Sequence, residues 1–294
     1  MDSQWKGKTE GTAWMHKTLI RSFKYLNLNL VYTGMAVFVI PFYMLFAHKG
    51  YISMYHFYRN RFGFSPIRSF YYVYKNHFRF GQVVLDRFAF YAGKKFVFEI
   101  ENYDMFQEKA KNSDGMLIIS SHVGNYELAG YTLKAKDKRF HAVVFSGEAE
   151  MIMKNRYKFL SGNNIEMIPV KDDMSHIFII NNALREGEVV SIPGDRIFGS
   201  PRYLECDFFG SKAKLPLGPF VLAVQRNVPA IAIFVMKTST MKYRIYIRQL
   251  TIDDSSCKNN KEKEANLAQK FANTMEEIVR LHPTQWFNYY EFWN

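Results

Sequence analysis

The sequence has very few of the residues that build disulfide-rich or zinc-binding proteins. Its 294 residues include two cysteines, Cys206 and Cys257, with no Cys-x-x-Cys or mixed Cys/His spacing. Two isolated cysteines supply neither a disulfide framework nor a zinc site of the usual kind. We therefore expect no metal and no cofactor, and a location in which cysteines stay reduced, as on the cytosolic side of a membrane.

Acidic residues are almost absent from the first third of the chain. Residues 1–95 contain 14 Lys and Arg but only three acids, a net charge of +11, whereas residues 96–294 carry +1. This basic N-terminal region (residues 1–95) also holds roughly half of the aromatic residues. It has no helix-turn-helix, zinc-finger or RNP-type pattern, so we expect no nucleic acid partner. Basic and aromatic side chains together favour a membrane interface; alternatively, the rings pack the core and the bases form a solvated face.

A stretch of eighteen mostly apolar residues without a charge lies inside this basic region, at residues 30–47. As a helix, this stretch would extend about 27 Å, slightly less than the roughly 30 Å hydrocarbon core of a bilayer. Pro41 is expected to kink the helix, and basic residues at both ends leave its orientation open. Three arrangements fit: an amphipathic or re-entrant membrane anchor, a membrane-spanning helix, and a buried helix pair. Residues 51–92 continue as helix, interrupted by Gly63 and Pro66.

Beyond residue 95 the pattern becomes regular, which divides the chain into residues 1–95 and 96–294. Short apolar runs of strand character occur at residues 116–120, 141–145, 165–170, 189–192 and 228–235. Helix-like segments separate the early runs, at residues 125–136, 148–160 and 173–186. This alternation predicts an α/β domain with a mostly parallel central sheet flanked by helices. Residues 243–252 alternate as an antiparallel edge strand would, and residues 261–281 form a long helix that Pro283 ends.

One loop at the carboxyl end of a predicted strand carries chemically useful side chains, at residues 120–127 (SSHVGNYE). In parallel α/β sheets, ligands bind at this edge. We expect Asn125 to cap the next helix and Glu127, in its first turn, to reach one nitrogen of His122. The other nitrogen is then an oriented general base. The alternative is a surface loop with a capping network only. Neither Ser120 nor Ser121 lies in a Gly-x-Ser-x-Gly elbow, which argues against a serine nucleophile.

The segment Ser-His-Val-Gly-Asn-Tyr-Glu-Leu resembles the His-x-x-x-x-(Asp/Glu) signature of the lysophospholipid acyltransferase superfamily. Its Gly-Asn-aromatic-Glu-Leu core is similar in particular to the lipid A late acyltransferases. Further blocks follow in that family's order: Arg156 within KNRY, Asp195-Arg196 at a strand end, FFG and LPLGP at residues 208–219, and PTQWF at residues 283–287. The resemblance therefore covers roughly residues 100–290.

Two departures from the family pattern bear on the acceptor. Arg196 stands where the family has Gln, and NYYEFW at residues 288–293 replaces a basic stretch that resembles His-Arg-Arg. The opening WKGKTEG at residues 5–11 is similar to a broader group of bacterial acyltransferases, some associated with aryl polyene or amino-acid lipids. Family membership is thus better specified by the sequence than the substrate is.

The resemblance implies a glycerol-phosphate-acyltransferase-like α/β fold behind an N-terminal helical membrane-anchoring region. It implies transfer of a fatty acyl group from a thioester to a lipid hydroxyl, with His122 as general base oriented by Glu127. The residues expected to bind substrate are Gly124, Asn125, Arg156, Asp195 and Arg196. Either Arg156 or a backbone N–H near Gly124 would stabilise the oxyanion. The structural alternatives are that Arg156 pairs with an acid and that Asp195 caps a turn.

The implied partners are an acyl carrier protein, or acyl-CoA, as donor, together with a lipid acceptor and membrane lipids. The implied location is the bacterial inner membrane, with the site facing the cytoplasm and a role in lipid A and lipopolysaccharide biosynthesis. An amino-acid lipid, a lysophospholipid and an aryl-polyene lipid are alternative acceptors. A non-catalytic lipid-binding membrane protein is the alternative class, against which a retained His122 and Glu127 argue.

Overall fold

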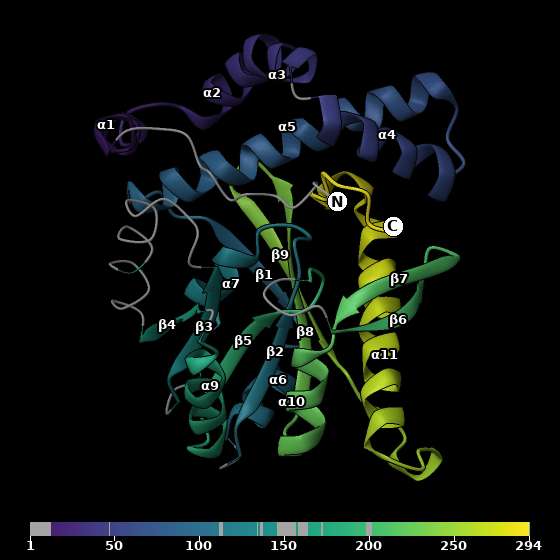
Figure 1. The fold of residues 1–294 in the computed structure, drawn as a ribbon. Helices are drawn as coiled ribbons and strands as arrows, with labels where there is room; N and C mark the ends of the chain where they lie inside the picture. The colour runs from purple at the N-terminus through teal and green to yellow at the C-terminus, as the bar shows by residue number, and fades with distance from the viewer. Residues whose placement is uncertain are drawn as a thin grey trace.

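A mostly parallel sheet forms the centre of the molecule (Figure 1). The computed structural model describes residues 13–46, 48–111, 114–133, 135, 138–145, 157, 164–171, 173–197 and 202–293. Within this part of the chain, seven strands pair in the order β1-β9-β8-β2-β5-β3-β4. Their bounds are β1 Val97–Glu101, β2 Met116–Ser120, β3 Phe140–Phe145, β4 Ile165–Val170, β5 Val189–Pro193, β8 Ala230–Ser239 and β9 Lys242–Gln249. Strands β8, β2, β5, β3 and β4 are mutually parallel, which confirms the predicted fold class.

Helices cover both faces of this sheet, as the nearly continuous apolar sequence of its inner strands requires. Leu117 and Ile119 of β2 belong to the core that includes helices α9 (Ser175–Arg185), α10 (Gly218–Arg226) and α11 (Asn260–Leu281). Met116 and Ile118 point to the other face, where the core includes α6 (Tyr103–Lys111) and α7 (Tyr126–Thr132). The predicted helix at residues 148–160 lies outside the described residues, apart from Tyr157.

The predicted edge strand is antiparallel, as expected, but it does not lie at the edge. Strand β9 pairs antiparallel with β8 on one side and parallel with β1 on the other. The polar residues that suggested solvent exposure instead meet acids of β1: Arg244 lies 2.9 Å from Glu99 and Arg248 lies 2.7 Å from Glu101. Alternating polar and apolar residues are therefore found in β9, which pairs with the short acidic strand β1, as well as in true edge strands.

A small hairpin, which the sequence analysis did not predict, explains the FFG block. Strands β6 (Tyr203–Phe208) and β7 (Ser211–Pro216) pair antiparallel across a two-residue turn. Both turn residues, Phe209 and Gly210, have positive φ, 50° and 74°. Two consecutive left-handed residues are typical of the tight hairpin turns that match the twist of the flanking strands.

Helices of the basic N-terminal region lie across one end of the sheet (Figure 1). Their bounds are α1 Ala13–Phe23, α2 Leu28–Gly34, a π-helical turn Met35–Val39, α3 Ile40–Phe46, α4 His48–Arg61 and α5 Pro66–Tyr91. Phe57 and Tyr58 of α4 and Val73 of α5 belong to the same buried core as Leu117 of β2. The change in composition near residue 95 thus marks where the N-terminal helices end and the α/β domain begins. The two regions nevertheless share a hydrophobic core.

The uncharged stretch is one helical segment, Leu28–Phe46, with a π-helical turn before Pro41. By length and composition it is the one segment of the described residues that could cross a membrane, and only 28% of it is buried. Its inner side packs on α5, where Gly81 has no Cβ that would meet Met35. Its outer side exposes Val37, Phe38, Val39, Phe42, Leu45 and Phe46. This exposed apolar row does not fit the buried helix pair.

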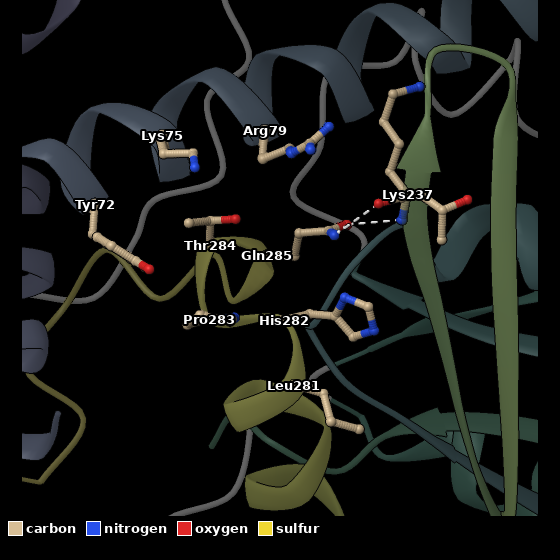
Figure 2. Close-up of a pocket in the computed structure, with 10 residues that line it drawn as sticks. Tyr72, Lys75, Arg79, Lys237, Leu281, His282, Pro283, Thr284 and Gln285 are labelled. Atoms are coloured by element: carbon tan, nitrogen blue, oxygen red, sulfur yellow. Dashed lines mark hydrogen bonds between the residues drawn. The ribbon is translucent and has the colours of Figure 1, made fainter.

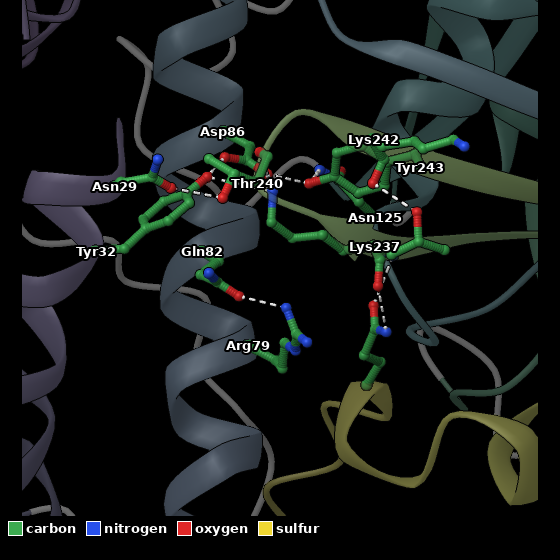
Figure 3. A network of polar contacts seen from close by, with 12 residues as sticks. Asn29, Tyr32, Arg79, Gln82, Asp86, Asn125, Lys237, Thr240, Lys242 and Tyr243 are labelled. Carbon is green, nitrogen blue, oxygen red and sulfur yellow. Dashed lines mark hydrogen bonds and ion pairs between the residues drawn. The ribbon is translucent and has the colours of Figure 1, made fainter. Parts of the chain in front are cut away.

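A buried ion pair joins these helices to the sheet (Figure 3). Nζ of Lys237, on β8, lies 2.5 Å from Oδ2 of Asp86, on α5, and both side chains have no exposed surface. The hydroxyls of Tyr32 and Tyr243 both donate to the same carboxylate. Lys237 also donates to the carbonyl of Thr240 at 2.8 Å. Helices α2 and α5 and the β8–β9 hairpin thus meet at one fully hydrogen-bonded charge.

Removing the cation of this pair should destabilise the protein strongly. Lys237→Met keeps the side-chain length but leaves Asp86 buried beside no positive partner, so we expect the free energy of unfolding to fall by about 3–5 kcal/mol. Lys242→Met is the matched control, because it removes a half-exposed ion pair with Glu99 on the same hairpin. We expect a much smaller loss there, because water screens an exposed ion pair. Denaturant unfolding in detergent measures both; equal losses would contradict the role given to the buried pair.

Candidate active site

His122 lies in the loop that follows β2, beside a buried carboxylate. Its Nδ1 is 3.0 Å from Oδ1 of Asp195, and its backbone N–H donates to Oδ2 of the same residue at 2.7 Å. An ionised carboxylate only accepts hydrogen bonds, so Nδ1 carries a proton, and in the neutral imidazole Nε2 then keeps its lone pair. The His122 side chain is 24% exposed, whereas Asp195 is 1% exposed. The arrangement is an oriented imidazole whose second nitrogen is available as a base.

Parallel strand pairing explains why these two residues meet. Ser120 at the end of β2 is the register partner of Pro193 at the end of β5. His122 and Asp195 each lie two residues beyond that pair, so the two chains leave the sheet side by side. Gly194 lies between Pro193 and Asp195, and a Cβ there would come within 2.3 Å of Ile119. The close approach of the β5 turn to β2 therefore requires glycine.

The carboxylate that orients His122 differs from the predicted one. Oε2 of Glu127 lies 2.7 Å from Nε of Arg87 on α5, and its side chain is only 7% exposed. Glu127 does lie in the first turn of α7, as predicted, but its carboxylate points to the partly buried Arg87 of α5. The predicted contact of Glu127 with the imidazole is therefore corrected to Asp195 at Nδ1, and a part for Glu127 in the reaction stays a prediction.

The electrostatics of Asp195 favour its charged form. Burial alone would raise the pKa of Asp195, but the attraction and hydrogen bonds of His122 and the charge of Arg196 outweigh burial. The pKa of Asp195 therefore lies below its ordinary value. The stability that this carboxylate contributes is present at neutral pH and is lost only as the pH falls through its lowered pKa.

Gly124 and Asn125 hold the loop in place. Gly124 has a φ of +70°, and a Cβ there would come within 2.1 Å of the Val235 carbonyl oxygen, so only glycine fits. The side chain of Asn125 makes no capping hydrogen bond; its Nδ2 instead lies 3.3 Å from the Tyr243 hydroxyl. Because Tyr243 in turn donates to Asp86, the loop is tied to the buried network (Figure 3). Asn125 was predicted to cap the helix with its side chain, but that side chain instead makes a buried contact with Tyr243.

Several backbone N–H groups of the His122 loop already donate hydrogen bonds to other parts of the protein. The N–H groups of Gly124 and Asn125 donate to the carbonyls of Gln285 and Val235, each at 2.7 Å, and that of His122 donates to Asp195. These three N–H groups are therefore not available to an oxyanion, and a donor at another N–H near Gly124 stays a prediction. Arg156, the other predicted donor, lies outside the described residues.

The C-terminal PTQWF block forms the wall beside His122. The N–H of Phe287 donates to the carbonyl of His122 at 3.1 Å, and Val123 makes an antiparallel bridge with Trp286. Arg196 points to the same wall: its Nη2 donates to the Phe287 carbonyl at 2.8 Å, and its guanidinium lies 5.6 Å from the Tyr290 ring. Arg196 thus fixes the wall, a role that the sequence did not indicate.

Among the described residues, no group of three or more His, Cys, Asp or Glu is placed to hold a metal ion.

The match to a family model agrees with the resemblance seen in the motifs. A model of the family described as bacterial lipid A biosynthesis acyltransferase matches residues 92–293. The phosphatidylinositol mannoside acyltransferase of Mycobacterium tuberculosis (strain ATCC 25618 / H37Rv) is 26% identical over 112 residues, 38% of this chain. That match spans 35% of the relative's own length. The solved 1-acyl-sn-glycerophosphate (LPA) acyltransferase of Thermotoga maritima matches 90% of this chain and 98% of its own, at 13% identity and a TM-score of 0.41.

The family match includes the His122 loop, the turn with Asp195, the β6–β7 hairpin and the PTQWF wall. It covers well over half of the chain, from the end of α5 to the C-terminal aromatic segment. This chain therefore belongs to the bacterial lipid A biosynthesis acyltransferase family.

Proposed function

We propose that this protein transfers a fatty acyl group from an acyl thioester to a hydroxyl of a lipid acceptor, with His122 as the general base. The observation that carries the proposal is the 3.0 Å contact between Nδ1 of His122 and Oδ1 of buried Asp195. It supports an imidazole whose Nε2 is unprotonated and faces away from the carboxylate. Family membership supports the reaction class. The name of the mycobacterial relative likewise points to acyl transfer onto a lipid.

The reaction follows from these positions. Nε2 of His122 takes the proton of the acceptor hydroxyl as its oxygen attacks the thioester carbonyl carbon. Asp195 stabilises the resulting imidazolium without accepting the proton itself. Collapse of the tetrahedral intermediate breaks the carbon–sulfur bond, and the imidazolium returns the proton to the leaving thiolate. A general base of this kind contributes about 10²–10⁴ in rate.

Glu127 and Arg156 complete the proposal. The ion pair of Glu127 with Arg87 supports a positioning role, because it fixes the start of α7 against α5. Arg156 is retained as the proposed donor to the oxyanion, since the N–H groups of His122, Gly124 and Asn125 are engaged elsewhere. A donor of this kind contributes on the order of 10²–10³ in rate.

The donor and acceptor are proposed from charge and family. Acyl carrier proteins are acidic, so the +11 charge of residues 1–95 favours an acyl carrier protein as donor. We propose a lipid A precursor as the acceptor and the cytoplasmic face of a bacterial inner membrane as the location. Arg196 and the NYYEFW segment depart from the family pattern, which keeps an amino-acid lipid, a lysophospholipid and an aryl-polyene lipid as further acceptors to assay.

Substitution of the two paired residues tests the mechanism. His122→Ala should lower turnover by about 10²–10⁴ by removing the base. Asp195→Asn keeps the shape but not the charge that stabilises imidazolium, so we expect a loss of at least about 10². Glu127→Gln should lose less, because that carboxylate meets Arg87. The assay follows release of free thiol from acyl-acyl carrier protein and the mass gain of the lipid acceptor.

The matched control for these variants is Asp104→Asn, at an exposed position on α6, which should leave turnover unchanged. Circular dichroism verifies that each variant is folded. A folded Asp195→Asn protein with near-wild-type turnover would contradict the pairing, and a fully active His122→Ala protein would contradict the proposed reaction. Absence of transfer to every acceptor would favour the non-catalytic lipid-binding alternative.

We also propose that the outer side of Leu28–Phe46 inserts into the membrane. Phe38 is 75% exposed and lies one helical turn from exposed Phe42, on a segment without any charge. Apolar side chains in a row of this length are unusual on a soluble surface, and they favour contact with lipid.

Acidic substitutions on this row should release the protein from membranes. We expect the paired change Phe38→Asp and Phe42→Asp to lower the membrane-bound fraction in flotation assays, because carboxylates are costly to bury in lipid. Phe178→Asp is the matched control: Phe178 is 74% exposed but lies on α9, at the opposite end of the molecule from α1–α3 (Figure 1). Equal flotation of wild type and the paired variant would contradict insertion through this row.

A further inference from the structure

A cavity lies between α5 and the segment that follows α11, and neither His122 nor Asp195 lines it. Its volume is about 360 Å³. Figure 2 shows Lys75 and Arg79 on α5 along one side, and Thr284 and Gln285 along the other. Cavities of this size lie at the lower end of the range for small ligands and headgroups. The cavity adjoins the active site through Gln285, whose carbonyl accepts from Gly124.

The charge of the cavity is positive and unbalanced. Lys75 and Arg79 are both partly buried, and no ion pair links either of them to a carboxylate in the part of the chain that the structure describes. Lys75 instead lies 5.0 Å from the Tyr71 ring, and Arg79 donates to the amide oxygen of Gln82 at 2.9 Å. The carboxylate that acts on Arg79, Asp86, is already paired with Lys237. Two cations therefore face the cavity without a counter-ion.

The imidazole of His282 lies close to the same positive charges. Burial lowers the pKa of His282, and the charges of Arg244 and Arg79 lower it further. His282 lines the cavity, and its Nε2 lies 2.9 Å from the Tyr246 hydroxyl. An anion in the cavity would offset the repulsion among these groups, whereas a cation or an apolar ligand would not.

One side of the cavity is hydrogen-bonded to the sheet. The side-chain oxygen of Gln285 accepts from the N–H of Lys237 at 2.8 Å, and its Nε2 donates to the Lys237 carbonyl at 3.0 Å. This two-point contact fixes the C-terminal segment to β8 (Figure 2). A preformed site loses little free energy to ordering when a ligand binds.

We propose that this cavity binds a phosphate group. A guanidinium fork matches the geometry of phosphate oxygens, and an ammonium group adds a compact point charge. The hydroxyl of Thr284 is a further donor on the opposite side. The phosphate of a membrane lipid is the favoured source, because α5 packs against α3 and the π-helical turn of the apolar Leu28–Phe46 segment. This site goes beyond acyl transfer, since binding there requires no chemistry at His122.

Two binding arms test the proposal on the full chain. In detergent, titration calorimetry at constant ionic strength measures binding of inorganic phosphate. In the second arm, flotation compares phosphatidylcholine vesicles that contain phosphatidic acid with vesicles that contain oleic acid, whose anionic group is a carboxylate. We expect preference for phosphatidic acid, and we expect Arg79→Gln and Lys75→Gln each to weaken binding by about tenfold or more through the loss of a charge-assisted hydrogen bond.

Lys24→Gln is the matched control, because it removes one exposed positive charge from the same basic region. Its binding should stay near wild type. Lys75→Gln keeps the test decisive if Arg79→Gln does not fold. Binding of inorganic phosphate alone would assign the site to a free phosphate, and binding only in the vesicle arm would assign it to a lipid headgroup. No phosphate preference in either arm, or equal losses in Lys75→Gln and Lys24→Gln, would overturn the proposal and leave the acyl-transfer proposal untouched.

Discussion

The parallel pairing of β2 with β5 is the constraint on which the candidate active site depends. Because the two strands are parallel and in register, the turns that follow them leave the sheet side by side. His122 and Asp195 therefore meet without a long loop. Glycine at position 194 lets the β5 turn approach β2, and Gly124 lets the His122 loop approach β8. An imidazole whose residue is held at two points by one buried carboxylate is already oriented, which is what the proposed proton transfer requires.

The N-terminal helices are part of this scaffold, and they also carry the surface that we propose contacts the membrane. Asp86 and Arg87 are neighbours on α5, and they hold the His122 loop and the start of α7 at two places: Asp86 through Tyr243 to Asn125, and Arg87 directly at Glu127. The outer side of the same region carries the exposed apolar segment. Helix α5 therefore connects the proposed lipid surface, the proposed phosphate cavity and the His122 loop.

Much of the α/β domain could be predicted from sequence, because its strands are buried on both faces and leave continuous apolar runs such as residues 116–120. The loop with His122 could be found for the same reason, since it follows such a run. The partner of His122 could not, because only the strand order places β5 beside β2. Asn125 and Glu127 fit a capping pattern locally, but contacts with Tyr243 and Arg87, distant in sequence, determine their positions.

A double-mutant cycle tests the central claim, that His122 and Asp195 act as one unit. Turnover is measured for wild type, His122→Ala, Asp195→Asn and the double variant under one set of conditions. If Asp195 acts only through the imidazole, the double variant should be no slower than His122→Ala alone, since effects within one unit are not additive. A double variant whose loss equals the product of the two single losses would show that Asp195 acts independently of His122, and would contradict the account.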